Sequence, residues 1–211
     1  MLRPVMMILA MAVLPLQVLA ATQSVPSTDG ALISAIAGAA PGDVLLLDPG
    51  PHQGPIELDR PITIDGQGKA KIYGNKTGSV ISVTGTDITI RGLEIVGSGS
   101  AHETIDSGIQ LHRTAARILV EDNRILGNLY GVDIHGAKQA TVRENVIIGR
   151  RDHRLNSRGN GIYVWNAPGT LVENNEIQFG RDGIFVNTSN RGVFRGNLML
   201  DLRFVGHYMY A

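Results

Sequence analysis

Gly108-Ile-Gln-Leu recurs along the chain as Gly131-Val-Asp-Ile, Gly161-Ile-Tyr-Val, Gly183-Ile-Phe-Val and Gly206-His-Tyr-Met. Successive copies lie about 22 residues apart, with one longer interval of 30 residues between the second and the third. Inside each copy apolar residues alternate with period two, which predicts a short strand with one inward face. No unit has room for the 10 to 12 helical residues of a leucine-rich or βα repeat. The repeat therefore predicts an all-β, right-handed, single-stranded parallel β-helix whose rungs stack about 4.8 Å apart.

A second marker recurs within each unit, and it predicts an internal ladder. Two residues after each marker stands an apolar residue, and Leu93 takes the marker's place one unit earlier. Asparagine tolerates the left-handed backbone of a corner, and its amide can hydrogen-bond to the amide of the next rung. The markers are Asn123, Asn145, Asn175 and Asn197.

Charged residues stand two positions before each marker, and their signs alternate without exception. Opposite charges then lie side by side on neighbouring rungs, which predicts a column that controls the strand register. This column gives a structural role to Glu121 and Glu173, which could otherwise be proposed as a catalytic pair. Its members are Arg91, Glu121, Arg143, Glu173 and Arg195.

Composition and the two ends of the chain frame this solenoid. The 26 glycines suit many tight corners, and the balance of 19 basic against 19 acidic side chains argues against a nucleic-acid partner. Residues 1–20 have the basic start, apolar stretch and small residues of a cleaved signal peptide, so we expect a periplasmic protein with no membrane span in the mature chain. In residues 21–43, Ser27, Thr28 and Asp29 offer an N-cap for a short helix from Ala31 to Ala37 that covers the first rung. Residues 44–211 form the rungs, and the last unit stops after its first strand, so we expect further rungs to follow.

The last copy of the repeat carries the candidate metal ligands. In it, His207 and Met209 occupy the two inward positions that hold aliphatic residues in every earlier copy. Imidazole and thioether on one face of a strand suit Cu(I), and the chain has no cysteine. The alternative interpretation is a buried histidine satisfied by a backbone carbonyl beside an ordinary core methionine. His112 and His135, outward on neighbouring copies, form a weaker alternative metal site.

The outward positions of the same strands collect the scarce aromatic residues, which marks a partner or ligand surface. We expect this surface to include Asp133, Tyr163, Trp165, Phe185, Tyr208 and Tyr210. Glycoside hydrolysis needs two carboxylates on either side of a sugar site, and Asp133 has no evident carboxylate partner. The sequence thus identifies no catalytic residue and predicts that the protein is not an enzyme. A carbohydrate-binding or carbohydrate-active β-helix remains the alternative function.

Four segments resemble the NosD family of periplasmic nitrous-oxide-reductase maturation proteins: Gly108-Ile-Gln-Leu-His, Leu129-Tyr-Gly-Val-Asp-Ile, Gly161-Ile-Tyr-Val-Trp-Asn and Phe204-Val-Gly-His-Tyr-Met-Tyr-Ala. The resemblance covers nearly all of the mature chain and implies the β-helix fold of carbohydrate-binding proteins and sugar hydrolases. It also implies a non-enzymatic assembly factor that handles copper and binds it transiently as Cu(I). The implied partners are the subunits of a membrane ABC transporter, a copper chaperone and nitrous oxide reductase, whose copper-sulfide centre is built with their help.

Overall fold

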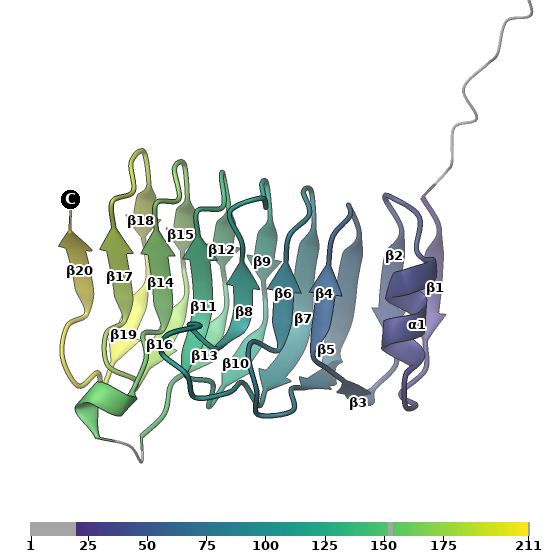
Figure 1. Cartoon of the computed structure of the whole chain (residues 1–211), viewed down its shortest axis with the longest axis horizontal. Coiled ribbons are helices and arrows are strands. Elements are labelled where there is room, and N and C mark those ends of the chain that lie inside the picture. The colour runs from purple at the N-terminus through teal and green to yellow at the C-terminus, as the bar shows by residue number, and fades with distance from the viewer. Residues whose placement is uncertain (1–19, 152–153, 211) are drawn as a thin grey trace, which may run out of the picture.

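The chain winds into a parallel β-helix whose axis runs along the longest dimension of the molecule (Figure 1). The computed structural model describes residues 20–151 and 154–210. All strand pairings between rungs are parallel among these residues, and the right-handed β-helix predicted from the repeat is confirmed. The predicted signal peptide, apart from Ala20, lies outside the described residues.

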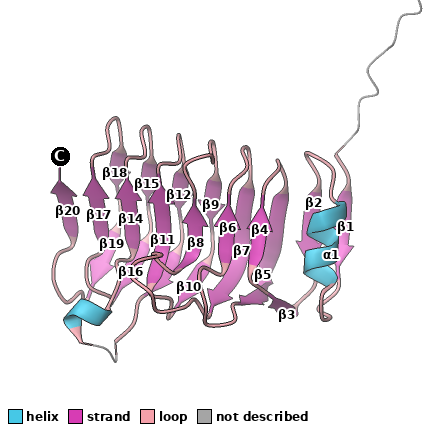
Figure 2. Ribbon diagram, viewed as in Figure 1, coloured by secondary structure: helices cyan, strands magenta, loops and turns pink. Residues whose placement is uncertain are grey.

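Two sheets form the walls of the helix, and Figure 2 shows how strands dominate it. The seven-stranded sheet carries the glycine-led copies of the repeat; its strands are β4 (Ile56–Leu58), β6 (Ile81–Val83), β8 (Ser107–Leu111), β11 (Tyr130–His135), β14 (Ile162–Trp165), β17 (Ile184–Asn187) and β20 (His207–Tyr210).

The thirteen-stranded sheet bends around the other side of the core. It begins with β1 (Thr22–Val25), β2 (Val44–Leu47), β3 (Gly50–Gln53), β5 (Thr63–Tyr73) and β7 (Thr89–Val96). One branch continues as β9 (Leu119–Glu121), β12 (Thr141–Arg143), β15 (Leu171–Glu173) and β18 (Val193–Arg195). The other branch continues as β10 (Arg124–Leu126), β13 (Val146–Ile148), β16 (Glu176–Gln178) and β19 (Leu198–Leu200). The two branches meet at β7. Strands β5 and β7 continue through one corner of the rung, whereas each later rung has two separate strands there.

The glycines that open the repeat are required by the close approach of the next rung. A Cβ atom on Gly131 would collide with the carbonyl oxygen of Gly161, and one on Gly183 would meet the carbonyl oxygen of Gly206. Beyond each glycine the inward residues stack in register with those of the next rung and are almost wholly buried. Close backbone approach, rather than an unusual backbone conformation, therefore explains why the repeat starts with glycine.

The asparagine ladder is observed, and it runs through four rungs. The Asn123 side-chain amide donates to Asn145 Oδ1 at 3.0 Å, Asn145 donates to Asn175 at 2.9 Å, and Asn175 donates to Asn197 at 2.9 Å. Each of these acceptor oxygens also receives the backbone N–H of the preceding asparagine. The ladder thus satisfies buried main-chain donors at a corner where the strands separate.

One expectation about this corner is wrong. The left-handed backbone falls on the residue before each asparagine and not on the asparagine itself. The physical reason is that the ladder asparagine must keep its side chain pointing inward, so the preceding, outward residue absorbs the turn. These left-handed residues are Asp122, Glu144, Asn174 and Gly196, with Gly92 before Leu93.

Within the charged column, ion pairs join particular pairs of neighbouring rungs. Arg143 pairs with Glu121 at 2.6 Å, and Arg195 pairs with Glu173 at 2.7 Å. Arg91 lies opposite Glu121 in the register but binds Asp65 at 2.9 Å instead. Such partly exposed pairs contribute about 0.2–1 kcal/mol each, so they favour the register more than they stabilise the fold.

A short helix covers the first rung, as expected, but its N-cap differs from the prediction. Helix α1 (Ala31–Gly38) buries Leu32 and Ile36 against the first strands. Its N-cap is Gly30, with φ of 73° and no side-chain hydrogen bond. Ser27 is unavailable for capping because its hydroxyl donates to the carbonyl oxygen of Pro51. A 3₁₀ turn, η1 (Leu155–Ser157), lies in the long loop before β14.

Replacing one ladder asparagine tests what holds the rungs together. Asn145→Ala leaves the buried backbone N–H of Asn123 without its acceptor, so we expect the free energy of unfolding to fall by ~3 kcal/mol. Asn190→Ala, at an exposed turn position, is the matched control. Urea unfolding monitored by circular dichroism measures both; equal midpoints for the two variants would remove the ladder from its stabilising role.

Candidate functional site

The outward face of the seven-stranded sheet brings together most of the residues that the sequence selects. Two columns run along it because each strand pairs in register with the next. The first column is Gln110, Asp133, Tyr163, Phe185 and Tyr208; the second contains His135, Trp165, Asn187 and Tyr210, with His112 just beyond the end of β8.

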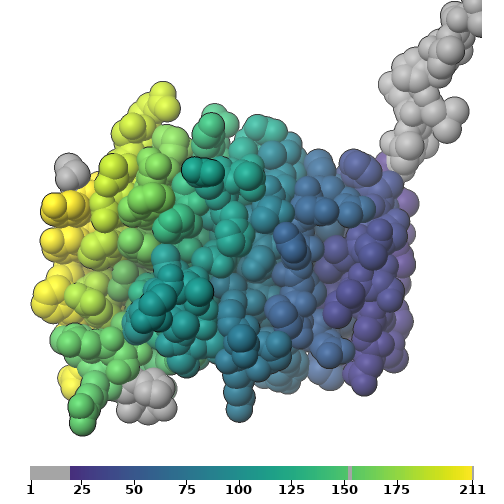
Figure 3. All heavy atoms as spheres, in the orientation of Figure 1, coloured from purple at the N-terminus to yellow at the C-terminus, as the bar shows by residue number. Residues whose placement is uncertain are grey.

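Asp133 faces outward from the sheet, yet its side chain has no exposed surface. Gln110 donates to Asp133 Oδ2 at 3.1 Å, and the same amide donates to the carbonyl oxygen of Thr104 at 3.2 Å. The long loop before β8 therefore folds back over the sheet, and in Figure 3 teal atoms from around residue 100 stand over this face. The other carboxyl oxygen of Asp133, Oδ1, has no hydrogen-bond partner among the described residues.

Burial sets the protonation of this carboxyl group. It raises the pKa of Asp133 to about 7, and the hydrogen bond from Gln110 opposes that rise only in part. Burial also raises the pKa of the neighbouring Tyr130 to about 12, helped by the charges of Tyr163 and Asp133. The centre of the face is thus a dry, polar patch that disfavours negative charge.

His135 lies beside Asp133 but does not form an ion pair with it near neutral pH. Its Nδ1 is 3.9 Å from Asp133 Oδ1, and both atoms are buried without a hydrogen-bond partner among the described residues. Burial, and then the charge of His112, lower the pKa of His135. The His135 ring stacks on Trp165 with centroids 4.3 Å apart. A neutral imidazole held in this way is a competent metal ligand, and it has His112 as its neighbour.

Four aromatic residues, here called the aromatic stack, form a continuous row along the helix axis. Tyr130, Tyr163, Phe185 and Tyr208 follow one another with centroid separations of 6.0, 5.4 and 4.9 Å. The last pair is nearly parallel, with an interplanar angle of 15°. The Tyr130–Tyr163 and Tyr163–Phe185 pairs are tilted, with interplanar angles of 36° and 52°, so only Phe185 and Tyr208 lie face to face in this row.

His207 and Met209 continue the inward columns of the core. His207 pairs in register with Ile184, and Met209 pairs with Val186, so both follow buried aliphatic positions. Both side chains are exposed in the last described strand, Met209 to 63%, and the His207 ring packs on Phe194 with ring centroids 5.1 Å apart. Burial lowers the pKa of His207, which favours the neutral imidazole that a metal ion needs.

Met199 is a further soft donor near this strand, and the sequence analysis does not select it. It lies inward on β19, partly buried, and its sulfur is close to the positions of Gly183 and Gly206. Only the winding of the chain brings β19 next to the start of β20, so spacing along the sequence carries no signal for it. Within residues 20–151 and 154–210, no group of three or more His, Cys, Asp or Glu side chains converges as a metal cluster.

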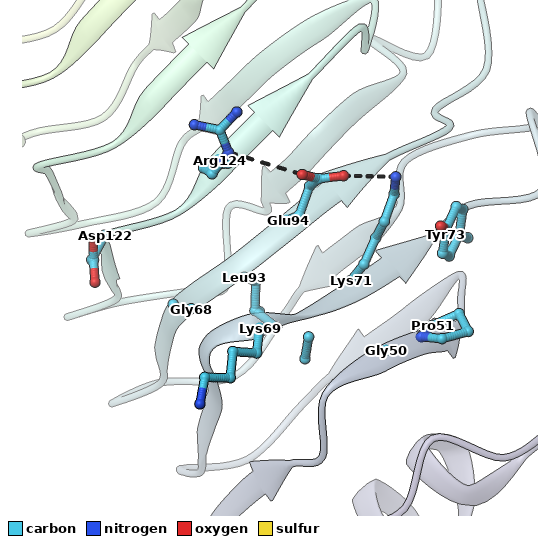
Figure 4. Close-up of a pocket in the computed structure, with 12 residues that line it drawn as sticks. Gly50, Pro51, Gly68, Lys69, Lys71, Tyr73, Leu93, Glu94, Asp122 and Arg124 are labelled. Atoms are coloured by element: carbon cyan, nitrogen blue, oxygen red, sulfur yellow. Dashed lines mark ion pairs between the residues drawn. The ribbon is translucent and has the colours of Figure 1, made fainter.

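A separate hollow of about 450 Å³ lies on the other sheet, where β5 carries a register shift between Asp65 and Ala70 (Figure 4). Its charged side chains largely satisfy one another: Lys71 binds Glu94 at 2.6 Å, and Arg124 lies 3.9 Å from the same carboxylate. None of the candidate metal ligands or partner-surface residues selected from the sequence lines it. We therefore place the candidate site on the seven-stranded sheet.

The buried carboxyl group of Asp133 makes stability depend on pH. Its folded pKa of about 7 lies above the ordinary 3.8, so the folded state holds a proton that the unfolded state releases, and stability falls as pH rises from about 4 to about 7. Asp133→Asn removes this loss, so we expect the variant to exceed the parent in unfolding free energy near pH 8, by about 4 kcal/mol at most. Glu57→Gln, exposed in the same column, is the control. Parallel pH profiles of unfolding for parent and Asp133→Asn would contradict the assignment.

Comparisons with known proteins agree with the sequence motifs. Residues 143–211 match the sequence model of a family described as "Periplasmic copper-binding protein (NosD)". A protein of Stutzerimonas stutzeri named "Probable ABC transporter binding protein NosD" is 31% identical over 137 residues, which make up 65% of this chain and 31% of that protein. Its namesake in Pseudomonas aeruginosa is 29% identical over 134 residues, 64% of this chain and 31% of that protein. The chain thus matches about a third of the length of these relatives.

Solved structures share the fold at low sequence identity. An alginate lyase from Paenibacillus superposes with a TM-score of 0.66 at 22% identity, over 85% of this chain and 76% of the lyase. Pectate lyase Pel9A gives a TM-score of 0.63 at 16% identity, over 90% of this chain and 62% of the lyase.

In the described part of the chain, no helix is long and apolar enough to cross a membrane. The family match includes the strand that carries His207 and Met209, and the resemblance to NosD indicated by the sequence is confirmed by the family model and by both curated relatives.

Proposed function

We propose that this protein is a periplasmic copper-handling assembly factor that works with an ABC transporter in building the copper-sulfide centre of nitrous oxide reductase. In this proposal copper is a cargo, bound transiently as Cu(I) and passed on. A copper chaperone and nitrous oxide reductase are the further partners. The chain itself carries out no catalysis.

The main support for the proposal is that soft donors replace the aliphatic residues at two core positions. Every earlier strand of the seven-stranded sheet from β8 onward places aliphatic side chains there, and β20 places His207 and Met209. Both residues fall inside the segment that matches a family described as copper-binding. His112 and His135 lie before that segment, which favours the pair on β20 over the outward histidines.

The chemistry of the pair suits a cargo rather than a permanent cofactor. Thioether and neutral imidazole bind Cu(I) without carrying a charge, and burial already lowers the pKa of His207. Two ligands from one strand leave coordination positions open for a donor from another protein. An open position of that kind allows a metal ion to be handed over by ligand exchange.

The partner assignments rest on the names of the relatives. Both carry the name "Probable ABC transporter binding protein NosD", and this chain resembles them over about two thirds of its own length. The proposal extends that association to the present chain.

Removing the soft donors should abolish tight copper binding. We expect His207→Ala combined with Met209→Ala to weaken Cu(I) affinity by more than about 100-fold, since even second-shell changes at metal sites cost 10- to 100-fold. Competition with a chromogenic Cu(I) chelator under anaerobic conditions measures the affinity. Tyr208→Phe, outward on the same strand, is the matched control, and His112→Ala with His135→Ala tests the alternative site. Unchanged affinity in the β20 double variant would refute the primary site.

The alternative function is a carbohydrate-binding or carbohydrate-active β-helix, and the aromatic face is what favours it. Cleavage by hydrolysis needs a second carboxylate near Asp133. The carboxylates Glu121 and Glu173 lie on the other sheet, where they form ion pairs with Arg143 and Arg195. We therefore propose that no polysaccharide is cut.

Incubation with acidic and neutral polysaccharides checks this directly. We expect no release of reducing ends or unsaturated sugars above the level of a heat-inactivated sample. Reproducible release that is lost in Asp133→Asn would overturn the non-enzymatic proposal and support the carbohydrate-active alternative.

A further inference from the structure

We propose that a pocket on the outward face of β17 and β20 binds a carboxylate side chain from an acidic segment of a partner protein. The pocket has a volume of about 520 Å³ and lies at the β20 end of the aromatic stack. It is lined by Arg181, Phe185, Asn187, Phe204, Tyr208 and Tyr210.

Three side-by-side pairs from two consecutive rungs build this pocket. Phe185 and Tyr208 pair in register and stack at 4.9 Å, and Asn187 pairs with Tyr210. The third pair is held by the backbone: the N–H of Phe204 donates to the carbonyl oxygen of Arg181 at 2.9 Å. The pocket is therefore fixed by the same rung stacking that fixes the core.

The polar groups in the lining are mainly donors. Arg181 contributes a guanidinium group, and its buried Nε has no hydrogen-bond partner among the described residues. Its nearest ionic partner, Asp182 Oδ2, stands 3.6 Å away. Asn187 Oδ1 already accepts from the Thr188 hydroxyl at 2.6 Å, which leaves the amide NH₂ to donate.

The charge of the lining points to the same ligand class. Among the described residues that line the pocket none is acidic, and Arg181 is the charged one. The edges of aromatic rings carry partial positive charge, and edges are what the Phe185–Tyr208 stack turns outward. A guanidinium, an amide NH₂ and positive ring edges together are complementary to a carboxylate.

The ring arrangement favours a peptide carboxylate over an acidic sugar. Pyranose rings pack on the open faces of aromatic residues. Here Phe185 and Tyr208 each use one face to stack on the other, and the Arg181 guanidinium lies 5.5 Å over the ring of Phe204. A carboxylate on a narrow, flexible side chain reaches the donors without needing an open face.

This surface is distinct from the proposed copper ligands. Tyr208 and Tyr210 alternate along β20 with His207 and Met209, so the two sets point to opposite faces of the strand. Peptide binding to the pocket neither requires copper nor reports on it, and each inference can fail without the other.

An array of short peptides tests the pocket, with probes centred on Glu or Asp and counterparts carrying Gln or Asn. We expect the 211-residue protein to bind a subset of acidic probes, to bind the amide counterparts at least about tenfold more weakly, and to lose affinity as salt rises. Fluorescence anisotropy with the best acidic probe then compares variants. Arg181→Gln should weaken binding by about tenfold or more. Arg191→Gln, which changes an exposed arginine in the loop between β17 and β18, should leave binding unchanged.

A second variant covers the case in which Arg181→Gln fails to fold. Asn187→Asp places a negative charge in the pocket and should also abolish binding, with cooperative melting as the check on folding. Equal binding of acidic and amide probes, or full binding by a folded Arg181→Gln variant, would overturn the proposal. So would an oligogalacturonate that binds with dependence on Arg181 while no acidic peptide binds.

Discussion

Parallel backbone pairing in a constant register is the constraint on which the rest of this structure depends. Each strand of the seven-stranded sheet lies beside the strand one rung away, so equivalent residues stack in columns. At the corner where these backbone bonds stop, the asparagine ladder takes over and binds the main-chain donors of the preceding rung. The glycines that open the repeat keep the backbones close enough for this stacking. A change that shifts one rung therefore disturbs every column at once.

Because residues stack in columns, each column acquires a property that no single residue has. The inward columns form one continuous aliphatic core, and the outward charged column alternates in sign. In the aromatic column neighbouring rings pack on one another, and Phe185 and Tyr208 lie face to face. Arg181 and Asn187 lie beside these rings, and their donors are the basis of our proposal that an anionic side chain binds there.

The sites in our proposals include residues whose chemical type differs from that of the other residues in their column. His207 and Met209 replace aliphatic residues in the core columns, and this replacement suggests a soft-metal cargo. Asp133 interrupts an outward column with a carboxyl group that burial holds at a pKa of about 7. The two departures lie on opposite faces of one sheet. In our proposals, one scaffold carries both a copper site on β20 and a partner-binding pocket beside it.

The sequence by itself determined the repeat, the parallel β-helix, the asparagine ladder and the membership of each column, because these follow from spacing and period-two alternation, which are local properties of the chain. Tertiary structure decided the burial of Asp133, because a loop some thirty residues upstream folds over it through Gln110 and Thr104. It also decided the stacking of His135 on Trp165, the approach of Met199 to β20 and the pairing of Arg181 with Phe204. The left-handed corner residues and the Gly30 cap differ from expectation for the same reason. Both differences depend on contacts between side chains of different rungs. Such contacts form only when the chain has folded into the β-helix.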